Sequence, residues 1–86
     1  MTQRVSAEVA LYPLRTPHLA MPIEAFLAAL DRQGLDITPG RMSTIVEGTP
    51  QAVFDALRAA FQAAAAEHDV VLRITVSNTC PHNTAT

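Results

Sequence analysis

The chain has 86 residues with six arginines, no lysine, eight acidic residues and a net charge of −2. This length allows one domain with a thin core, for which self-association is an expected remedy, and an apolar content of 49% is that of a globular chain. Because the arginines are scattered singly, the sequence lacks the clustered positive charge that nucleic-acid binding requires.

The cysteine content and the apolar runs bear on the compartment. Cys80 is the only cysteine, so it forms no internal disulfide and indicates a reducing compartment. Residues 1–9 pass directly into strand-like alternation without the apolar core of a signal peptide. No apolar run reaches the length of a membrane span. We therefore expect a cytoplasmic protein that contacts no membrane.

Residues 5–12 alternate between two sets of side chains, which is the period of a half-buried strand, and Pro13 is expected to end that strand. A loop follows. Pro22 then opens a predicted helix that stops near Gly34. The apolar stripe of this helix recurs at helical spacing. It consists of Ile23, Phe26, Leu27 and Leu30.

Two short strands are expected at residues 35–38 and 42–47, joined by a turn at Pro39-Gly40. The second of them has two alternating sets of side chains. We expect the set that contains Met42 and Val46 to face the core, because these two suit apolar surroundings better. The outward set is then Ser43, Ile45 and Glu47.

Thr49 and Pro50 are the expected N-cap and first residue of a long helix. Its expected buried stripe is Val53, Phe54, Leu57 and Phe61. Residues 69–77 alternate as the last strand. These elements form one domain, residues 1–79, and the polar residues 80–86 follow it as a C-terminal tail.

The order of elements, β-α-β-β-α-β, is typical of a ferredoxin-like α+β fold. Such a fold has a four-stranded antiparallel sheet with both helices on one face and the first and third strands in the centre. The other face carries the second alternating set of each strand. Its expected members are Ser6, Glu8, Ala10, Tyr12, Ser43, Ile45, Glu47, Val71, Arg73, Thr75 and Ser77.

This uncovered face mixes carboxylates and hydroxyls with apolar side chains, which is typical of a surface that contacts a ligand or another subunit. A carboxylate such as Glu8 or Glu47 accepts hydrogen bonds from an exocyclic amine, and Tyr12 can stack on a ring or meet a cation. The face therefore favours a cationic or amino-heteroaromatic ligand.

Three segments resemble those of the thiamine/hydroxymethylpyrimidine-binding YkoF-like family: VSAEVALYPL at 5–14, MSTIVEG at 42–48 and VSNTCP at 76–81. The resemblance implies a protein that binds thiamine or its hydroxymethylpyrimidine moiety without catalysis or a separate cofactor. It also implies a homo-oligomer, dimer or tetramer, that associates through its sheets. The candidate ligand-binding residues are Glu8, Tyr12, Ser43, Thr44, Glu47, Ser77 and Asn78.

Two positions depart from this family pattern. Arg15 stands where a glycine is usual, and Arg41 stands where a proline or another residue often precedes the MST segment. Together with Arg73, they are expected to bring positive charge to the site. Such charge suits a phosphate-bearing ligand better than the thiamine cation.

Two other functions stay open. In the first, the sheet face only joins subunits, and the protein is an interaction or regulatory module without a thiamine ligand. The second is a catalytic or metal site at Cys80 and His82, to which His18 and His68 could contribute. That site lacks a third group to fix a nucleophile and lacks the spacing of metal ligands.

Overall fold

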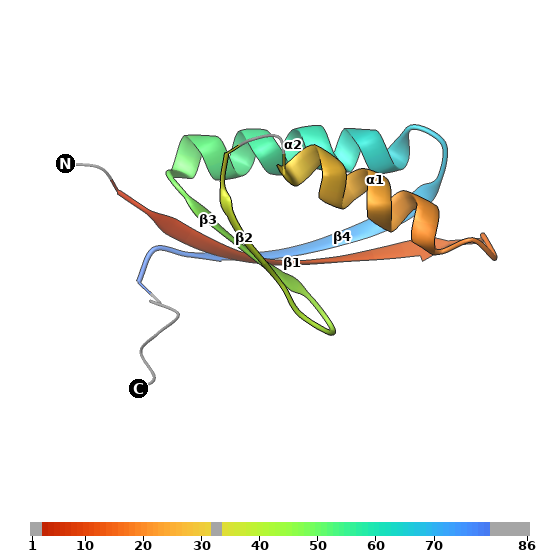
Figure 1. Cartoon of the computed structure of the whole chain (residues 1–86), viewed down its shortest axis with the longest axis horizontal. Helices are drawn as coiled ribbons and strands as arrows, with labels where there is room; N and C mark the ends of the chain where they lie inside the picture. The colour runs from red at the N-terminus through yellow and green to blue at the C-terminus, as the bar shows by residue number, and fades with distance from the viewer. Residues whose placement is uncertain (1–2, 32–33, 80–86) are drawn as a thin grey trace.

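Both helices cover the same side of a four-stranded antiparallel sheet (Figure 1). The structure is a computed structural model that describes residues 3–31 and 34–79. In chain order the elements are β1 (Val5–Leu14), α1 (Ala20–Asp31), β2 (Asp36–Pro39), β3 (Thr44–Gly48), α2 (Pro50–Ala65) and β4 (Asp69–Ser77). The predicted ferredoxin-like α+β fold is confirmed.

The strand order is β2-β3-β1-β4, so β1 and β3 are the central strands, as predicted. β1 pairs with β3 only from Val5 to Val9, whereas it pairs with β4 from Ser6 to Leu14. Beyond Val9, β1 therefore has a neighbour on one side only. This explains why Pro13 does not end β1, contrary to our prediction: a residue without an N–H is tolerated where a strand has a free edge.

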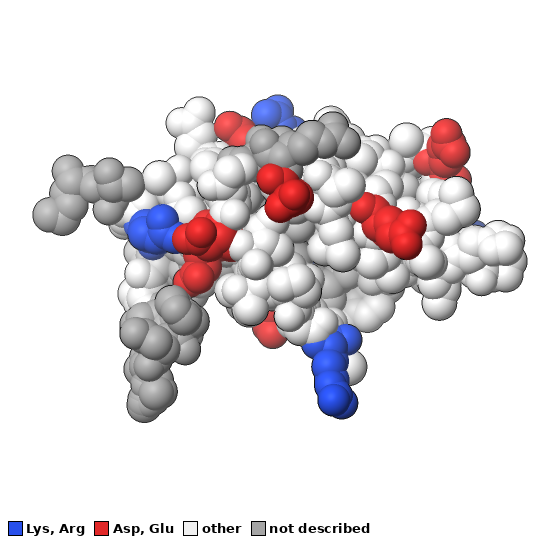
Figure 2. Space-filling view, viewed as in Figure 1, with Lys and Arg blue, Asp and Glu red and all other residues white. Residues whose placement is uncertain are grey.

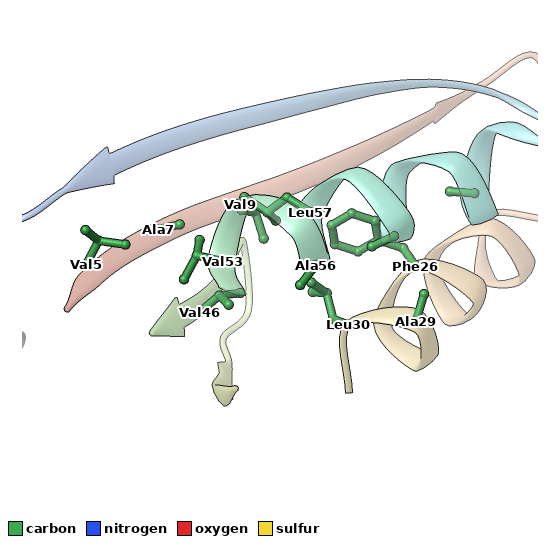
Figure 3. Packing of buried hydrophobic residues seen from close by; sticks show 12 residues of the cluster. Val5, Ala7, Val9, Phe26, Ala29, Leu30, Val46, Val53, Ala56 and Leu57 are labelled. Atoms are coloured by element: carbon green, nitrogen blue, oxygen red, sulfur yellow. The ribbon is translucent and has the colours of Figure 1, made fainter. Parts of the chain in front are cut away.

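A cluster of buried apolar side chains fills the space between sheet and helices (Figure 3). Val5, Ala7 and Val9 contribute the inward set of β1, which confirms the predicted alternation. Leu30 of α1 is fully buried in the same cluster. The burial of one such side chain contributes about 1.5–3 kcal/mol.

The buried face of α2 is narrower than predicted. Val53 and Leu57 are buried as expected, but Phe54 is 53% exposed and Phe61 is 38% exposed. The two phenylalanines instead border a shallow apolar groove beside β4. Small side chains take the inward positions and let α2 lie close to α1 and the sheet. They are Ala56, Ala60 and Ala64.

The predicted start of α2 is confirmed. Thr49 has extended backbone angles, and its side-chain oxygen accepts a 3.2 Å hydrogen bond from the N–H of Ala52. An N-cap of this kind contributes about 1 kcal/mol to stability. After α1, Gly34 has a φ of 72°, a left-handed conformation that favours glycine. None of the helices in the described part of the chain is long and apolar enough to cross a membrane.

Candidate functional site on the open face

The open face is the side of the sheet that no helix in the described residues covers (Figure 1). One row of polar side chains crosses it, where Ser6 of β1 lies opposite both Glu47 of β3 and Ser77 of β4. Ser6 Oγ donates a 2.9 Å hydrogen bond to Glu47 Oε2. Ser77 Oγ accepts a 3.0 Å hydrogen bond from the N–H of Thr79. Asn78 is exposed just beyond this row.

A hollow of about 200 Å³ lies next to this row on the same face. Ala10 forms its floor, because its methyl group is shorter than the side chains of Glu8 and Tyr12 on the same strand and of Arg73 directly across on β4. We call it the open-face hollow. Its lining residues are Glu8, Ala10, Tyr12, Met42, Ser43, Arg73 and Thr75.

The carboxylate of Glu8 is held by a residue of the turn that precedes β3. Ser43 Oγ donates a 3.0 Å hydrogen bond to Glu8 Oε2. Within the described residues this is the one hydrogen bond that Glu8 makes, so its second carboxylate oxygen can accept from a ligand. Tyr12, which is 44% exposed, lies four residues after Glu8 on β1, beyond Ala10. A carboxylate and an aromatic ring therefore border the same small hollow.

Met42 contributes to the rim of the open-face hollow and not to the core. Its side chain is 86% exposed, so the prediction that Met42 faces inward is wrong. The reason is that β3 begins only at Thr44, and a turn closed by a 2.8 Å hydrogen bond from Gly40 N–H to the Ser43 carbonyl precedes it. This turn carries Met42 away from the sheet.

Thr44 faces the opposite side of the sheet and is only 9% exposed. It lines a second hollow, of about 240 Å³, between α1, the β2–β3 turn and the part of β1 beyond Val9. This space exists because β3 does not continue alongside β1 there. The two hollows share Ala10, Met42 and Ser43, so Thr44 lies near the open-face hollow but on the helix side.

The structure thus separates the expected site residues into groups. Glu8, Tyr12 and Ser43 line the open-face hollow. Glu47 and Ser77 belong to the neighbouring row. The contact of each of these residues with a ligand stays a prediction.

Two polar residues of the hollow, Arg73 and Thr75, are not among the candidate ligand-binding residues, although Arg73 was expected to bring positive charge near the site. Both lie on the open face, as the alternation of the last strand predicts. Their position beside Glu8 and Ala10 depends on the pairing register of β1 with β4. Period-two alternation gives the face of a side chain but not its neighbour across the sheet.

The arginines do not gather at the site as expected. Arg15 forms a 3.1 Å salt bridge with Asp69 and lines a different, polar hollow at the end of α2. Its φ of 55° is in the left-handed region that favours glycine. Arg41 lines the helix-side hollow. On the side of the molecule drawn in Figure 2, the basic groups are separated from one another and form no patch.

No metal site is present in the described part of the chain, where no three His, Cys, Asp or Glu residues gather closely enough to hold an ion. Cys80 and His82, which carried the alternative catalytic or metal hypothesis, lie outside the described residues. His18 is exposed in the loop after β1, and His68 lies between α2 and β4.

Several solved structures share this fold. A domain of unknown function from Bacillus cereus is 21% identical with a TM-score of 0.79, over 90% of this chain and 77% of that one. A Streptococcus pneumoniae protein is 20% identical with a TM-score of 0.81, over 86% of this chain and 84% of that one.

A third similar structure comes from Thermotoga maritima, and a role in thiamine biosynthesis or salvage has been suggested for that protein. It is 17% identical with a TM-score of 0.78, over 86% of this chain and 82% of that one. At these identities the likeness shows the fold alone. No curated protein matches the chain.

Fold and site together define a small ferredoxin-like domain with a polar hollow on the uncovered face of its sheet. The sequence profile of the YKOF-related family matches residues 4–83. The chain belongs to this family, which confirms the resemblance found in its three sequence segments.

Proposed function

We propose that the protein binds thiamine or its hydroxymethylpyrimidine moiety in the open-face hollow, without catalysis and without a separate cofactor. The observation that carries this proposal is the Glu8 carboxylate, held by Ser43 and bordered by the Tyr12 ring. An aminopyrimidine offers the complementary groups, because its exocyclic amine donates to a carboxylate and its ring stacks on a tyrosine.

The size of the hollow favours the smaller of these two ligands. Its volume of about 200 Å³ is below the roughly 300–1,000 Å³ of pockets that enclose drug-sized molecules. One substituted ring suits this volume better than the two linked rings of thiamine. Membership of the YKOF-related family and the role suggested for the Thermotoga maritima protein both support a thiamine-related ligand.

We further propose that the protein acts in the cytoplasm as a homo-oligomer, a dimer or a tetramer, in which a second copy covers the open face. Tyr12 and Val71 lie opposite each other on this face and are 44% and 45% exposed. Such adjacent, exposed apolar groups support a contact with another subunit. A partner would also deepen a hollow that is shallow in the single chain.

Isothermal titration calorimetry tests the ligand. We expect heat with thiamine and with hydroxymethylpyrimidine, and tighter binding of the latter. The matched control is the same pyrimidine without its 4-amino group, which cannot donate to Glu8 and should bind at least about fivefold more weakly, since an unpaired partner costs about 1–3 kcal/mol. If neither ligand produces heat or a thermal shift, the binding function is wrong.

The same experiment distinguishes the second candidate function, an interaction module whose open face only joins subunits. The exposed Tyr12 and Val71 would serve that role equally well. A stable oligomer that binds none of the pyrimidines would favour this module over the binding protein.

A further inference from the structure

Arg73 differs from most of the described arginines in the pairing of its charge. Three others each have an aspartate oxygen within 3.4 Å, and they are Arg4, Arg15 and Arg58. Among the residues that the structure describes, Arg73 has no such partner. Arg41 has none either, but it does not line the open-face hollow. Arg73 is therefore the cation of the hollow whose charge no described side chain neutralises.

The nearest acid on the same face does not neutralise Arg73. Arg73 lies opposite Ala10, and Glu8 is two residues away along β1, which makes Glu8 and Arg73 diagonal neighbours. Such neighbours are about 7–8 Å apart at the backbone, within reach of long side chains. The two nevertheless form no ion pair, and Glu8 accepts from Ser43 instead. The hollow thus has an anionic and a cationic border.

We propose that the natural ligand of the open-face hollow is phosphorylated, with its amino-substituted ring at Glu8 and its phosphate at Arg73. This inference rests on the proposed function and specifies which form of the ligand is bound. A guanidinium donates two parallel hydrogen bonds to phosphate oxygens. The hydroxyl of Thr75, on the same face of β4, supplies a further donor.

Charge and size together point to hydroxymethylpyrimidine phosphate as the member of this class that fits best. It has one ring, which suits a volume of about 200 Å³, and its phosphate is anionic. Unphosphorylated thiamine brings a positive charge toward Arg73 and gains nothing from it. The phosphate also remains at the solvent side of a shallow hollow, where its hydration is largely kept.

Calorimetric titrations of four ligands into the full chain test this inference. The ligands are hydroxymethylpyrimidine, its phosphate, thiamine and thiamine monophosphate. We expect each phosphate ester to bind about tenfold or more tightly than its parent compound, since hydrogen bonds to charged groups are the stronger ones. Arg73→Gln should abolish the preference for each ester over its parent compound.

The matched control is Arg58→Gln on α2, which removes an exposed arginine outside the hollow and should preserve the preference for the esters. Arg73→Lys keeps the positive charge but loses the planar guanidinium that donates two parallel hydrogen bonds, so part of the preference for the esters should remain. Circular dichroism and thermal melts verify that each variant is folded. If Arg73→Gln does not fold, the Arg73→Lys variant carries the test.

The outcomes separate this inference from the proposed function. Equal affinity for ester and parent in the unaltered protein overturns the phosphate inference and leaves the proposed function intact. A preference for the esters that survives Arg73→Gln also overturns it, because the phosphate is then bound elsewhere. If none of the four compounds binds, both are wrong.

Discussion

Ser43 Oγ lies 3.0 Å from Glu8 Oε2, and this hydrogen bond connects the β2–β3 turn to the middle of a central strand. The geometry of the turn therefore sets the orientation of the carboxylate. Gly40 is required for that geometry, because a Cβ atom at this position would lie 2.8 Å from the carbonyl oxygen of Ser43. The backbone conformation at Gly40 thus determines the position of Ser43, and Ser43 in turn holds the Glu8 carboxylate.

Glu8→Gln tests the role of the carboxylate charge. Glutamine can still accept a hydrogen bond from Ser43 and from a ligand amine, but the bond is no longer charge-assisted. We expect binding of hydroxymethylpyrimidine to weaken about five- to tenfold, since charged hydrogen bonds exceed neutral ones by roughly 1 kcal/mol. Calorimetry measures this change. Glu24→Gln on the exposed surface of α1 is the matched control, and an equal loss there would contradict a specific role for Glu8.

Ser43→Ala tests whether the carboxylate must be held in place. The variant removes the Oγ donor, so Glu8 becomes free to leave its position beside the hollow. We expect about three- to tenfold weaker ligand binding, with a change in unfolding free energy within about 0.5 kcal/mol because the contact is exposed.

The control for Ser43→Ala is Ser6→Ala, which deletes the same type of serine-to-glutamate hydrogen bond, 2.9 Å long, one row outside the hollow. It should leave the affinity unchanged. If Ser6→Ala weakens binding and Ser43→Ala does not, the ligand lies over Glu47 rather than over Glu8.

Ala10→Leu tests the location of the site without removing any polar group. The larger side chain should fill the floor of the open-face hollow, so we expect ligand heat to disappear while the thermal midpoint changes little. Thr38→Leu is the control. Thr38 lies opposite Ile45 on the same face but does not line the hollow. Retained binding in the Ala10→Leu variant would place the ligand elsewhere.

Much of the architecture follows from local sequence signals. Period-two alternation in residues 5–12 and 69–77 correctly assigns the faces of the two longest strands, because one face of each must be buried. The N-cap at Thr49 can be predicted from the residue type, because a threonine oxygen at this position accepts from a backbone N–H in the first turn of the same helix. These features depend on residues that are close together in the chain.

The wrong predictions depend on relations between distant segments. Met42 is apolar and in phase with Val46, but the turn closed by Gly40 and Ser43 ends the sheet before it. Phe54 and Phe61 are large and at helical spacing, but α2 lies so close to the sheet and to α1 that alanines occupy the inward positions. Arg73 is expected near the site as a positive charge but not as a ligand-binding residue, because its neighbours across the sheet depend on the register of β1 with β4.

Val71→Asp tests whether a second copy covers the open face. A carboxylate placed beside Tyr12 would be buried without a partner in such an interface, so we expect the protein to shift to monomers in sedimentation equilibrium. Phe54→Asp is the control, because Phe54 is 53% exposed but lies on the helix side. If Phe54→Asp dissociates the assembly and Val71→Asp does not, the subunits meet along α2 and β4.

A pair of identical substitutions in α2 tests how closely the helix approaches its neighbours. Ala60 is fully buried, whereas Ala63, three residues later on the same helix, is exposed. Ala60→Leu forces three additional heavy atoms into a space that admits a methyl group, and we expect it to lower the free energy of unfolding by about 1–3 kcal/mol. Ala63→Leu should change it by less than about 0.5 kcal/mol, because leucine and alanine are both good helix formers. Urea denaturation measures both values, and equal midpoints for the two variants would mean that the alanines do not set the distance between α2 and the rest of the core.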